Sequence, residues 1–227
     1  MDGLLLIDKP SGWTSFDVVA KVRGTLKHAG LPKPKVGHTG TLDPLATGLL
    51  ILVVGSYCKR AQEFSKLDKT YQVTAKLGQT STTGDAEGQL TAVSQQQPSH
   101  EQVEAAIAKF SGPISQMPPQ YSAIKVNGKR AYQLAREGKV ADLQPREVTI
   151  YGYVDAEFVY PNLSFEVSVS SGTYIRSLVE DIGTDLQTGA YTTKLRRTKV
   201  GDYAVDDAMT IEQLSSDQIA KHLITLA

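Results

Sequence analysis

The chain has 227 residues, with 24 Lys and Arg balanced by 24 Asp and Glu, and a single cysteine, Cys58. Its apolar content of 41% and charged content of 21% are typical of a globular protein with a buried core. These totals exclude an internal disulfide and a zinc cage of cysteines. The apolar runs are also far shorter than the roughly 18 residues of a membrane helix, and no signal peptide pattern is present. We therefore expect a cytoplasmic protein.

The balanced total conceals an uneven distribution of charge. Residues 1–80 hold 11 Lys and Arg against 6 Asp and Glu, a net charge of +5, and residues 81–227 carry the opposite net charge. A neutral protein with charge segregated in this way can still present a basic face to a nucleic acid. A second basic cluster spans residues 194–199, a pattern equally typical of a strand edge protected by cations.

The first elements are a strand and a helix. Residues 3–7 predict a short buried strand, followed by a turn. Thr14 and Asp17 then fit a capping box, in which the hydroxyl and the carboxylate satisfy the first backbone N–H groups of a helix. This helix carries Val19, Val22 and Leu26 on one face and should end near Gly30.

The stretch Val36–Gly48 is rich in Gly and Thr and leads into the apolar residues 49–54. It predicts a structured loop held by a strand, a place where catalytic groups often lie. Pro44 restricts the backbone of Asp43 to extended conformations, which limits the directions that the carboxylate can take. Two interpretations remain open, because Asp43 could be a presented functional acid or could simply start an Asp-Pro turn, with His38 as a solvated loop residue.

The next segments are a short helix over residues 55–64 and a strand over Lys69–Leu77. The alternation of the strand indicates one buried face that includes Tyr71. Tyr71 is thus a core residue or an aromatic platform beside a site, and periodicity favours the core. Residues 80–88 predict a loop, and residues 89–97 a flexible segment.

A second capping pattern, Ser99 with Gln102, begins an amphipathic helix that Gly112-Pro113 should end. A strand over residues 121–126, an Asn127-Gly128 turn and a short helix over residues 131–136 follow.

Residues 147–160 and 163–170 then predict a long hairpin. Thr173 should cap the next helix, which places Arg176 in the first turn. The helix dipole disfavours a cation there, so we expect Arg176 to have a compensating partner. A strand over residues 191–205 and a short helix complete the chain.

Strands and helices do not alternate regularly, which favours an α+β fold with a large mixed or antiparallel sheet flanked by helices and loops. No repeat or low-complexity linker divides the chain, so we expect one domain over residues 1–227. Dinucleotide-binding and P-loop patterns are absent from the sequence.

Several motifs resemble those of the TruB family of tRNA pseudouridine synthases. They are D-K-P-S-G-W-T-S at residues 8–15, G-H-T-G-T-L-D-P-L-A-T-G at 37–48, K-T-Y at 69–71, the 118–125 segment, G-T-Y-I-R at 172–176 and L-R-R at 195–197. The resemblance implies a pseudouridine synthase fold and an isomerase that converts uridine 55 in the T-loop of tRNA to pseudouridine without cofactor or metal. Bacterial members usually carry a further RNA-binding domain of PUA type, which we expect to be absent here.

The resemblance also assigns roles to residues. It implies a catalytic set of Asp43 as the reacting aspartate, Arg176 as its partner, and Tyr71 stacked on the target base. His38 would enter the T-loop as the base leaves, while Tyr174 and Leu195 would line the uracil pocket. Phosphate contacts are expected from the basic cluster, namely Lys194, Arg196, Arg197 and Lys199. The expected partner is the T-arm stem-loop of tRNA. We expect the protein to be a monomer and not to bind a membrane.

The chemical route stays open at this point, because Asp43 could attack C1′, attack the base or remove a ribose proton. A non-catalytic RNA-binding or tRNA chaperone module is the main alternative function. A glycosidase that pairs Asp43 with Asp85 would be expected to carry sugar-stacking tryptophans, and Trp13 is the sole tryptophan. A metal site at His38 and Asp43 has few ligands to draw on.

Overall fold

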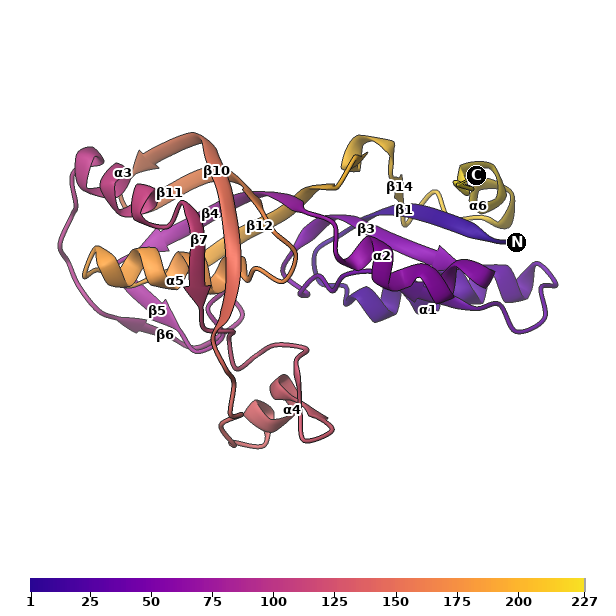
Figure 1. The fold of residues 1–227 in the computed structure, drawn as a ribbon, viewed down its shortest axis with the longest axis horizontal. Coiled ribbons are helices and arrows are strands. Elements are labelled where there is room, and N and C mark those ends of the chain that lie inside the picture. Colours follow the sequence, from indigo (N-terminus) through magenta and orange to yellow (C-terminus); the bar gives the residue numbers. More distant parts are fainter. Residues whose placement is uncertain (227) are drawn as a thin grey trace. The chain divides into compact units, whose positions relative to one another are not determined.

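The computed structural model describes residues 1–226, and it confirms the α+β class. Ten strands form one mixed sheet in the order β14-β1-β3-β12-β4-β11-β10-β7, with β2 paired to β3 and β13 to β12 (Figure 1). These strands are β1 (Gly3–Lys9), β2 (Val36–His38), β3 (Thr47–Val54), β4 (Lys69–Leu77), β7 (Gly112–Gln116), β10 (Arg146–Val159), β11 (Asn162–Val169), β12 (Ala190–Val200), β13 (Tyr203–Ala204) and β14 (Met209–Thr210).

Two small hairpins and six α-helices accompany the sheet within the described residues. The hairpins pair β5 (Gln79–Ser81) with β6 (Leu90–Ala92), and β8 (Lys125–Val126) with β9 (Lys129–Arg130). The α-helices are α1 (Ser15–His28), α2 (Ala61–Ser65), α3 (His100–Lys109), α4 (Ala131–Arg136), α5 (Ile175–Asp185) and α6 (Ser216–His222). No helix within residues 1–226 is both long and apolar enough to cross a membrane.

The chain divides into two compact units. One combines residues 1–71 with the segment from residue 195 onward, and the other comprises residues 72–194. Strands β4 and β12 each have residues in both units. The first unit is therefore discontinuous in sequence. The sequence has no low-complexity linker that would have indicated this division.

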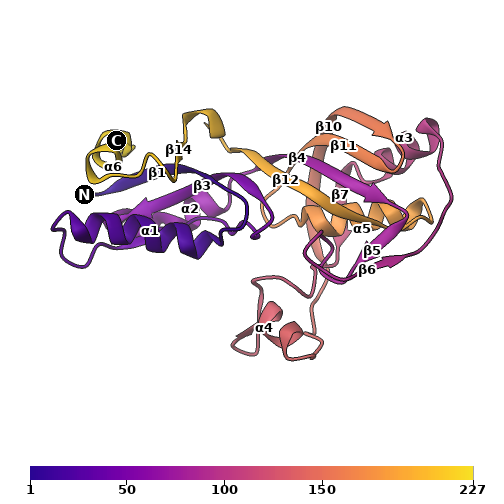
Figure 2. The same ribbon diagram turned by 180° about the vertical axis from the view of Figure 1, so that it is seen from behind.

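In the first unit, β1 and β3 are apolar runs paired antiparallel from Gly3 opposite Val54 to Lys9 opposite Gly48. Both strands are almost fully buried, and α1 lies along them in both views (Figures 1 and 2). The capping box that starts α1 is present as predicted: the Thr14 backbone N–H donates to Asp17, and the Asp17 N–H donates to the Thr14 hydroxyl. The predicted apolar face of α1 is buried. The short helix predicted over 55–64 is a 3₁₀ helix, Gly55–Arg60, followed by α2.

In the second unit, β10 and β11 form the predicted long hairpin, and β7 pairs antiparallel with β10. The capping box at Ser99 starts α3 as predicted. The segment 89–97 contains the short strand β6, which pairs with β5. One prediction was wrong. The hydroxyl of Thr173 does not cap α5, since it donates to the Ser170 carbonyl and Tyr174 occupies the cap position.

Residues 117–145 form an excursion between β7 and β10 that we call the hairpin module. It has a small core of its own, formed by Ala131, Ala141, Leu143, Ile124, Val126 and Leu134. Asn127 and Gly128 both have positive φ, as the tight turn between β8 and β9 requires. The strand predicted over 121–126 is limited to Lys125–Val126, while α4 has its predicted bounds. Both views show α4 set apart from α3 and α5 (Figures 1 and 2).

Candidate active site

The loop that carries Asp43 connects β2 to β3 and is fixed to the start of α1. Its neighbour Leu42 donates a backbone hydrogen bond of 2.8 Å to the hydroxyl of Ser15, and that hydroxyl donates back to the Leu42 carbonyl at 3.1 Å. Ser15 is 2% exposed. Within the loop, the backbone N–H of Ala46 donates to the carbonyl of Asp43 at 3.1 Å. The structure thus confirms an ordered loop at Asp43.

On the other side of Asp43, Pro44 is held by the end of β1. The fully buried ammonium of Lys9 donates to the carbonyls of Pro10, Trp13 and Pro44, at 2.8, 2.7 and 3.3 Å. The backbone N–H of Gly12 also donates to the Pro44 carbonyl. The motifs at residues 8–15 and 37–48 are therefore joined by hydrogen bonds on both sides of Asp43.

The basic cluster on β12 has two different faces. Arg197 is 2% exposed, and its guanidinium donates to the carbonyls of Leu49 and Gly40, at 2.7 and 3.1 Å. Arg196 points elsewhere and forms two hydrogen bonds with the carboxylate of Asp8. Lys194 and Lys199 are exposed. We therefore withdraw the expected contact between Arg197 and an RNA phosphate, because a buried guanidinium that is bonded to the protein backbone is not available to RNA.

The other expected site residues of the first unit lie on its strands. His38 ends β2, half-buried, opposite Leu52 of β3. Tyr71 on β4 and Leu195 on β12 are each 8% exposed. The alternating burial of Lys69–Leu77 confirms the predicted strand and its buried face. The two roles considered for Tyr71, in the core or beside a site, stay predictions.

The start of β4 is anchored by a buried lysine. The ammonium of Lys69 donates to the carbonyls of Ser65 and Leu67, at the end of α2. Burial lowers the pKa of Lys69 to about 8, with a further contribution from the charge of Arg197 that Asp68 opposes. Since Lys69 lies two positions before Tyr71, this anchor holds the strand that carries the tyrosine.

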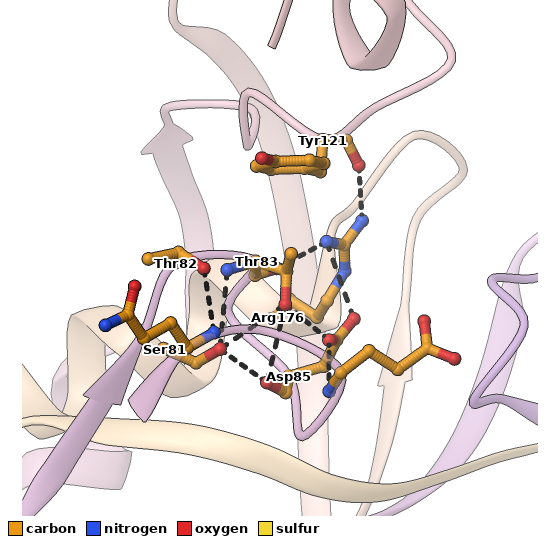
Figure 3. Close-up of polar contacts among 8 residues, drawn as sticks. Ser81, Thr82, Thr83, Asp85, Tyr121 and Arg176 are labelled. Carbon is orange, nitrogen blue, oxygen red and sulfur yellow. Dashed lines mark hydrogen bonds and ion pairs between the residues drawn. The ribbon is translucent and has the colours of Figure 1, made fainter. Parts of the chain in front are cut away.

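In the second unit, Arg176 is the centre of a buried polar cluster (Figure 3). Its Nη1 donates to the Thr83 carbonyl at 2.5 Å, and its Nη2 donates to the Tyr121 carbonyl at 2.7 Å. Nη1 also lies 3.7 Å from Oδ2 of Asp85, and both side chains of this ion pair are about 5% exposed. Arg176 thus has a compensating charge within its own unit, as its position in the first turn of α5 required. Sequence reasoning did not identify Asp85 in this role.

Asp85 is itself held by the turn around it. The Thr83 hydroxyl donates to Oδ1 of Asp85 at 2.6 Å, the backbone N–H of Glu87 donates to the same oxygen, and the Ser81 hydroxyl donates to the Asp85 carbonyl. Gly84 has a φ of +74°, and an added Cβ would lie 3.0 Å from Oε1 of Glu180. Ser, Thr, Gly and Asp are common in turns of this kind, where their side chains bond to the nearby backbone. The sequence of residues 81–85 therefore already indicated a turn.

A second acid lies near Arg176. Glu180 follows Arg176 by one turn of α5, and burial raises the pKa of Glu180 to about 7. The charge of Arg176 opposes this rise, while Asp181 and Asp85 add to it. Arg176 therefore has two acidic side chains beside it, Asp85 and Glu180.

Tyr174 is fixed by its backbone. Its N–H donates to Oε1 of Gln116 at 2.8 Å, and its carbonyl accepts from Nε2 of the same buried residue at 3.1 Å. The guanidinium of Arg146 lies 5.7 Å from the centre of the Tyr174 ring. The Ser177 hydroxyl donates to the carbonyl of Met117. Residues 116–121 are thus tied to the first turn of α5, and Gln116 is a supporting residue that no sequence pattern indicated.

The expected site residues divide between the two units. Asp43, His38, Tyr71 and Leu195 belong to the first unit, and Tyr174 and Arg176 belong to the second. Within residues 1–226, no three His, Cys, Asp or Glu side chains gather in a way that could hold a metal ion.

Comparisons with known proteins place the chain in a family. The sequence model described as "TruB family pseudouridylate synthase (N terminal domain)" matches residues 27–175, and the "tRNA pseudouridylate synthase B C-terminal domain" matches residues 176–224. The tRNA pseudouridine synthase B of Thermobifida fusca is 43% identical over 228 residues, which cover 95% of this chain and 75% of that protein. The tRNA pseudouridine synthase B of Clostridium kluyveri is 42% identical, over 100% of this chain and 76% of that protein.

Solved structures show the same fold. The crystal structure of a Cbf5-Nop10-Gar1 complex matches with a TM-score of 0.70 and 26% sequence identity, over 97% of this chain and 57% of that one. The likeness extends over both units and agrees with the α+β class. The sequence identity to the curated relatives and the length of both matches show that this chain belongs to the TruB family of pseudouridylate synthases, and is therefore an isomerase.

Proposed function

We propose that this chain converts uridine 55 in the T-loop of tRNA to pseudouridine, with Asp43 as the reacting carboxylate and residues 1–227 acting together as one catalytic domain. The proposal rests on the near full-length similarity to relatives named tRNA pseudouridine synthase B. It is supported by the loop of Asp43, whose two neighbours Leu42 and Pro44 are both hydrogen-bonded to the segment 8–15. A catalytic carboxylate needs such a fixed backbone, because small displacements reduce the rate strongly.

The reaction breaks the bond from N1 of uracil to C1′ of the ribose and joins C5 to C1′ after the base has turned. C5 then loses its proton and N1 gains one, so the composition of the nucleotide is unchanged. Asp43 can act as nucleophile at C1′, as nucleophile at the base, or as the base that removes a ribose proton. Each route requires an ionised carboxylate in a site that excludes water.

Arg176 is proposed as the residue that favours the ionised form of Asp43, and the family resemblance carries this pairing. Burial alone would raise the pKa of a carboxylate, and a neighbouring guanidinium opposes that effect. The bonds of Arg176 to Thr83, Tyr121 and Asp85 support the proposal, since they restrict the guanidinium to one place. Tyr71 is proposed to stack on the flipped base, which recovers about 1–3 kcal/mol of the unstacking cost. His38, Tyr174 and Leu195 keep the substrate-binding roles that the resemblance implies.

The hairpin module is proposed as an RNA contact in place of Arg197. It carries five exposed cations against two acids, and the cations are Lys125, Lys129, Arg130, Arg136 and Lys139. Glu137 pairs with two of them, Lys129 and Lys139. Exposed cations on a separate module are suited to phosphate contacts, as are Lys194 and Lys199 on β12. We propose that the T-arm stem-loop is sufficient as substrate.

The test is to incubate the protein with unmodified tRNA and to map pseudouridine by position. We expect modification at uridine 55 by the parent, and at the same position in an isolated T-arm stem-loop. The Asp43→Asn variant should bind tRNA within about tenfold of the parent affinity and form no product, because the amide is nearly isosteric but cannot act as nucleophile or base. A parent that binds tRNA tightly without forming pseudouridine would instead support the RNA-binding module.

A further inference from the structure

Arg197 is a buried cation whose hydrogen bonds go to backbone carbonyls. Its guanidinium donates through Nε to Leu49 and through Nη2 to Gly40, and no ion pair of Arg197 occurs within residues 1–226. Removing a charged group from water is costly unless hydrogen bonds compensate it. The two carbonyls that compensate Arg197 belong to the segments just before and just after Asp43. The buried charge is therefore linked to the geometry of this loop.

The backbone of Arg197 approaches the same loop at a third point. Strands β12 and β3 run parallel, with Arg197 opposite Gly48. Gly48 has a φ of +101°, and an added Cβ would lie 2.8 Å from the backbone nitrogen of Arg197. A side chain cannot fit in this space, so the loop and β12 are in direct contact there. Arg197 thus contacts Gly40, which precedes Asp43 in the sequence, and Gly48 and Leu49, which follow it.

We propose that Arg197 is a positioning residue for Asp43, which closes the two ends of the loop against each other. The proposal rests on the proposed function of Asp43 and extends it to a residue that does not touch the substrate. A guanidinium suits this position because Nε and Nη2 are separate donors held in one plane, and they reach the Leu49 and Gly40 carbonyls at once. A lysine has all its donors on a single nitrogen at the end of a flexible stem. Arg197, which the sequence analysis expected to contact phosphate, therefore acts on the loop of Asp43 instead.

The experiment compares Arg197→Met and Arg197→Lys with Val200→Ala, a core substitution on the same strand that leaves both hydrogen bonds of Arg197 in place. Single-turnover rates are measured at saturating tRNA, tRNA affinity is measured separately, and amide hydrogen exchange is followed by residue. Exchange is read at Leu42 and Ala46, whose amides donate to Ser15 and Asp43. Leu4 and Leu77 serve as reference amides, bonded to Ile224 and Pro161.

For Arg197→Met we expect a rate at least 30-fold below that of the parent, with tRNA affinity within about threefold. Exchange at Leu42 and Ala46 should be at least tenfold faster, while Leu4 and Leu77 stay within twofold of the parent. Arg197→Lys should recover part of the rate and part of the protection. Val200→Ala should lower the melting temperature and keep the rate within twofold. If Arg197→Met does not fold, Arg197→Lys carries the same comparison.

Three outcomes would overturn the proposal. A loss of tRNA affinity with an unchanged rate would show that Arg197 contacts a phosphate of the RNA and does not position Asp43. Unchanged exchange at Leu42 and Ala46 would show that the loop is held without Arg197. A faster exchange with an unchanged rate would show that the closed loop is not needed for catalysis. A parent without pseudouridine synthase activity would refute the proposed function, and the exchange measurement would still decide whether Arg197 holds the loop.

Discussion

The ammonium of Lys9 lies 3.3 Å from the carbonyl oxygen of Pro44, the residue that follows Asp43. Lys9 is fully buried, and this contact joins residues that are 35 positions apart in the chain. On the preceding side, Ser15 makes the equivalent connection to Leu42. The backbone on both sides of Asp43 is therefore bonded to one short segment at the start of the chain. Substitutions in this segment can therefore test whether these bonds hold the proposed catalytic acid in position.

Ser15→Ala should lower the free energy of unfolding by about 1–3 kcal/mol. The substitution removes the acceptor of the Leu42 N–H and the donor to its carbonyl, and leaves two buried polar groups without their partner. The single-turnover rate on tRNA should fall in addition, since the loop is less restricted. Urea denaturation and rapid-quench kinetics provide the two measurements. Ser11→Ala is the control, because its hydroxyl is exposed and makes one long bond of 3.4 Å to Leu45. Equal effects of the two substitutions would contradict the role of Ser15.

Asp85→Asn should lower the free energy of unfolding by about 1–3 kcal/mol, because it removes the negative charge beside the buried guanidinium of Arg176. The bonds of Arg176 to Thr83 and Tyr121 limit the loss. The rate on tRNA should decrease with little change in affinity if Arg176 acts in catalysis. Thermal unfolding and single-turnover kinetics test both effects. Glu104→Gln, which changes an exposed acid on α3, should leave both quantities within experimental error.

Glu180→Gln should change the dependence of stability on pH. The unfolded chain releases the Glu180 proton near pH 4.5, and the folded protein retains it up to about pH 7. The unfolded state then binds fewer protons in this window, so Glu180 lowers the free energy of unfolding as pH rises from about 4.5 to 7. The variant lacks this loss, and its stability relative to the parent should increase by about 1–2 kcal/mol across the window, allowing for solvent screening.

Urea denaturation at several pH values measures the effect of Glu180→Gln. The neighbouring groups that also titrate or carry charge are Arg176, Asp85 and Asp181, and all three stay in place in this variant. Parallel stability curves for the variant and the parent would show that Glu180 is not protonated in the folded protein at pH 6.

Reversal of two cations in the hairpin module, Lys125→Glu with Arg130→Glu, should weaken tRNA binding. If both contact phosphates, the slope of log affinity against log salt concentration should become less steep by about 1.4–1.8. Filter binding from low to moderate salt measures the slope for tRNA and for the isolated T-arm. Lys221→Glu, an exposed cation on α6, is the control and should leave the slope unchanged. A slope that does not respond to the double variant would exclude phosphate contacts by these two residues.

Many elements were predictable from residues close together in the sequence. The capping boxes at Thr14 and Ser99 act over three positions, and both start a helix as predicted. The alternation in residues 69–77 reproduced the bounds of β4, and the hairpin of β10 and β11 followed from its two apolar runs. The ordered loop around Asp43 was likewise indicated by its glycines and by Pro44. Such features depend on backbone geometry and local hydrogen bonds, which neighbouring residues determine.

The roles of individual charges were decided by tertiary structure. Arg196 and Arg197 look alike in the sequence, yet successive residues of a strand face opposite sides. One therefore pairs with Asp8, and the other is buried against the Asp43 loop. Asp85 and Arg176 are also brought together from distant parts of the chain. Sequence patterns alone indicated most of the longer helices and strands and the ordered loop around Asp43. Burial and the choice of charge partners depended on long-range packing, because a side chain's neighbours across the sheet are set by pairing between strands far apart in the sequence.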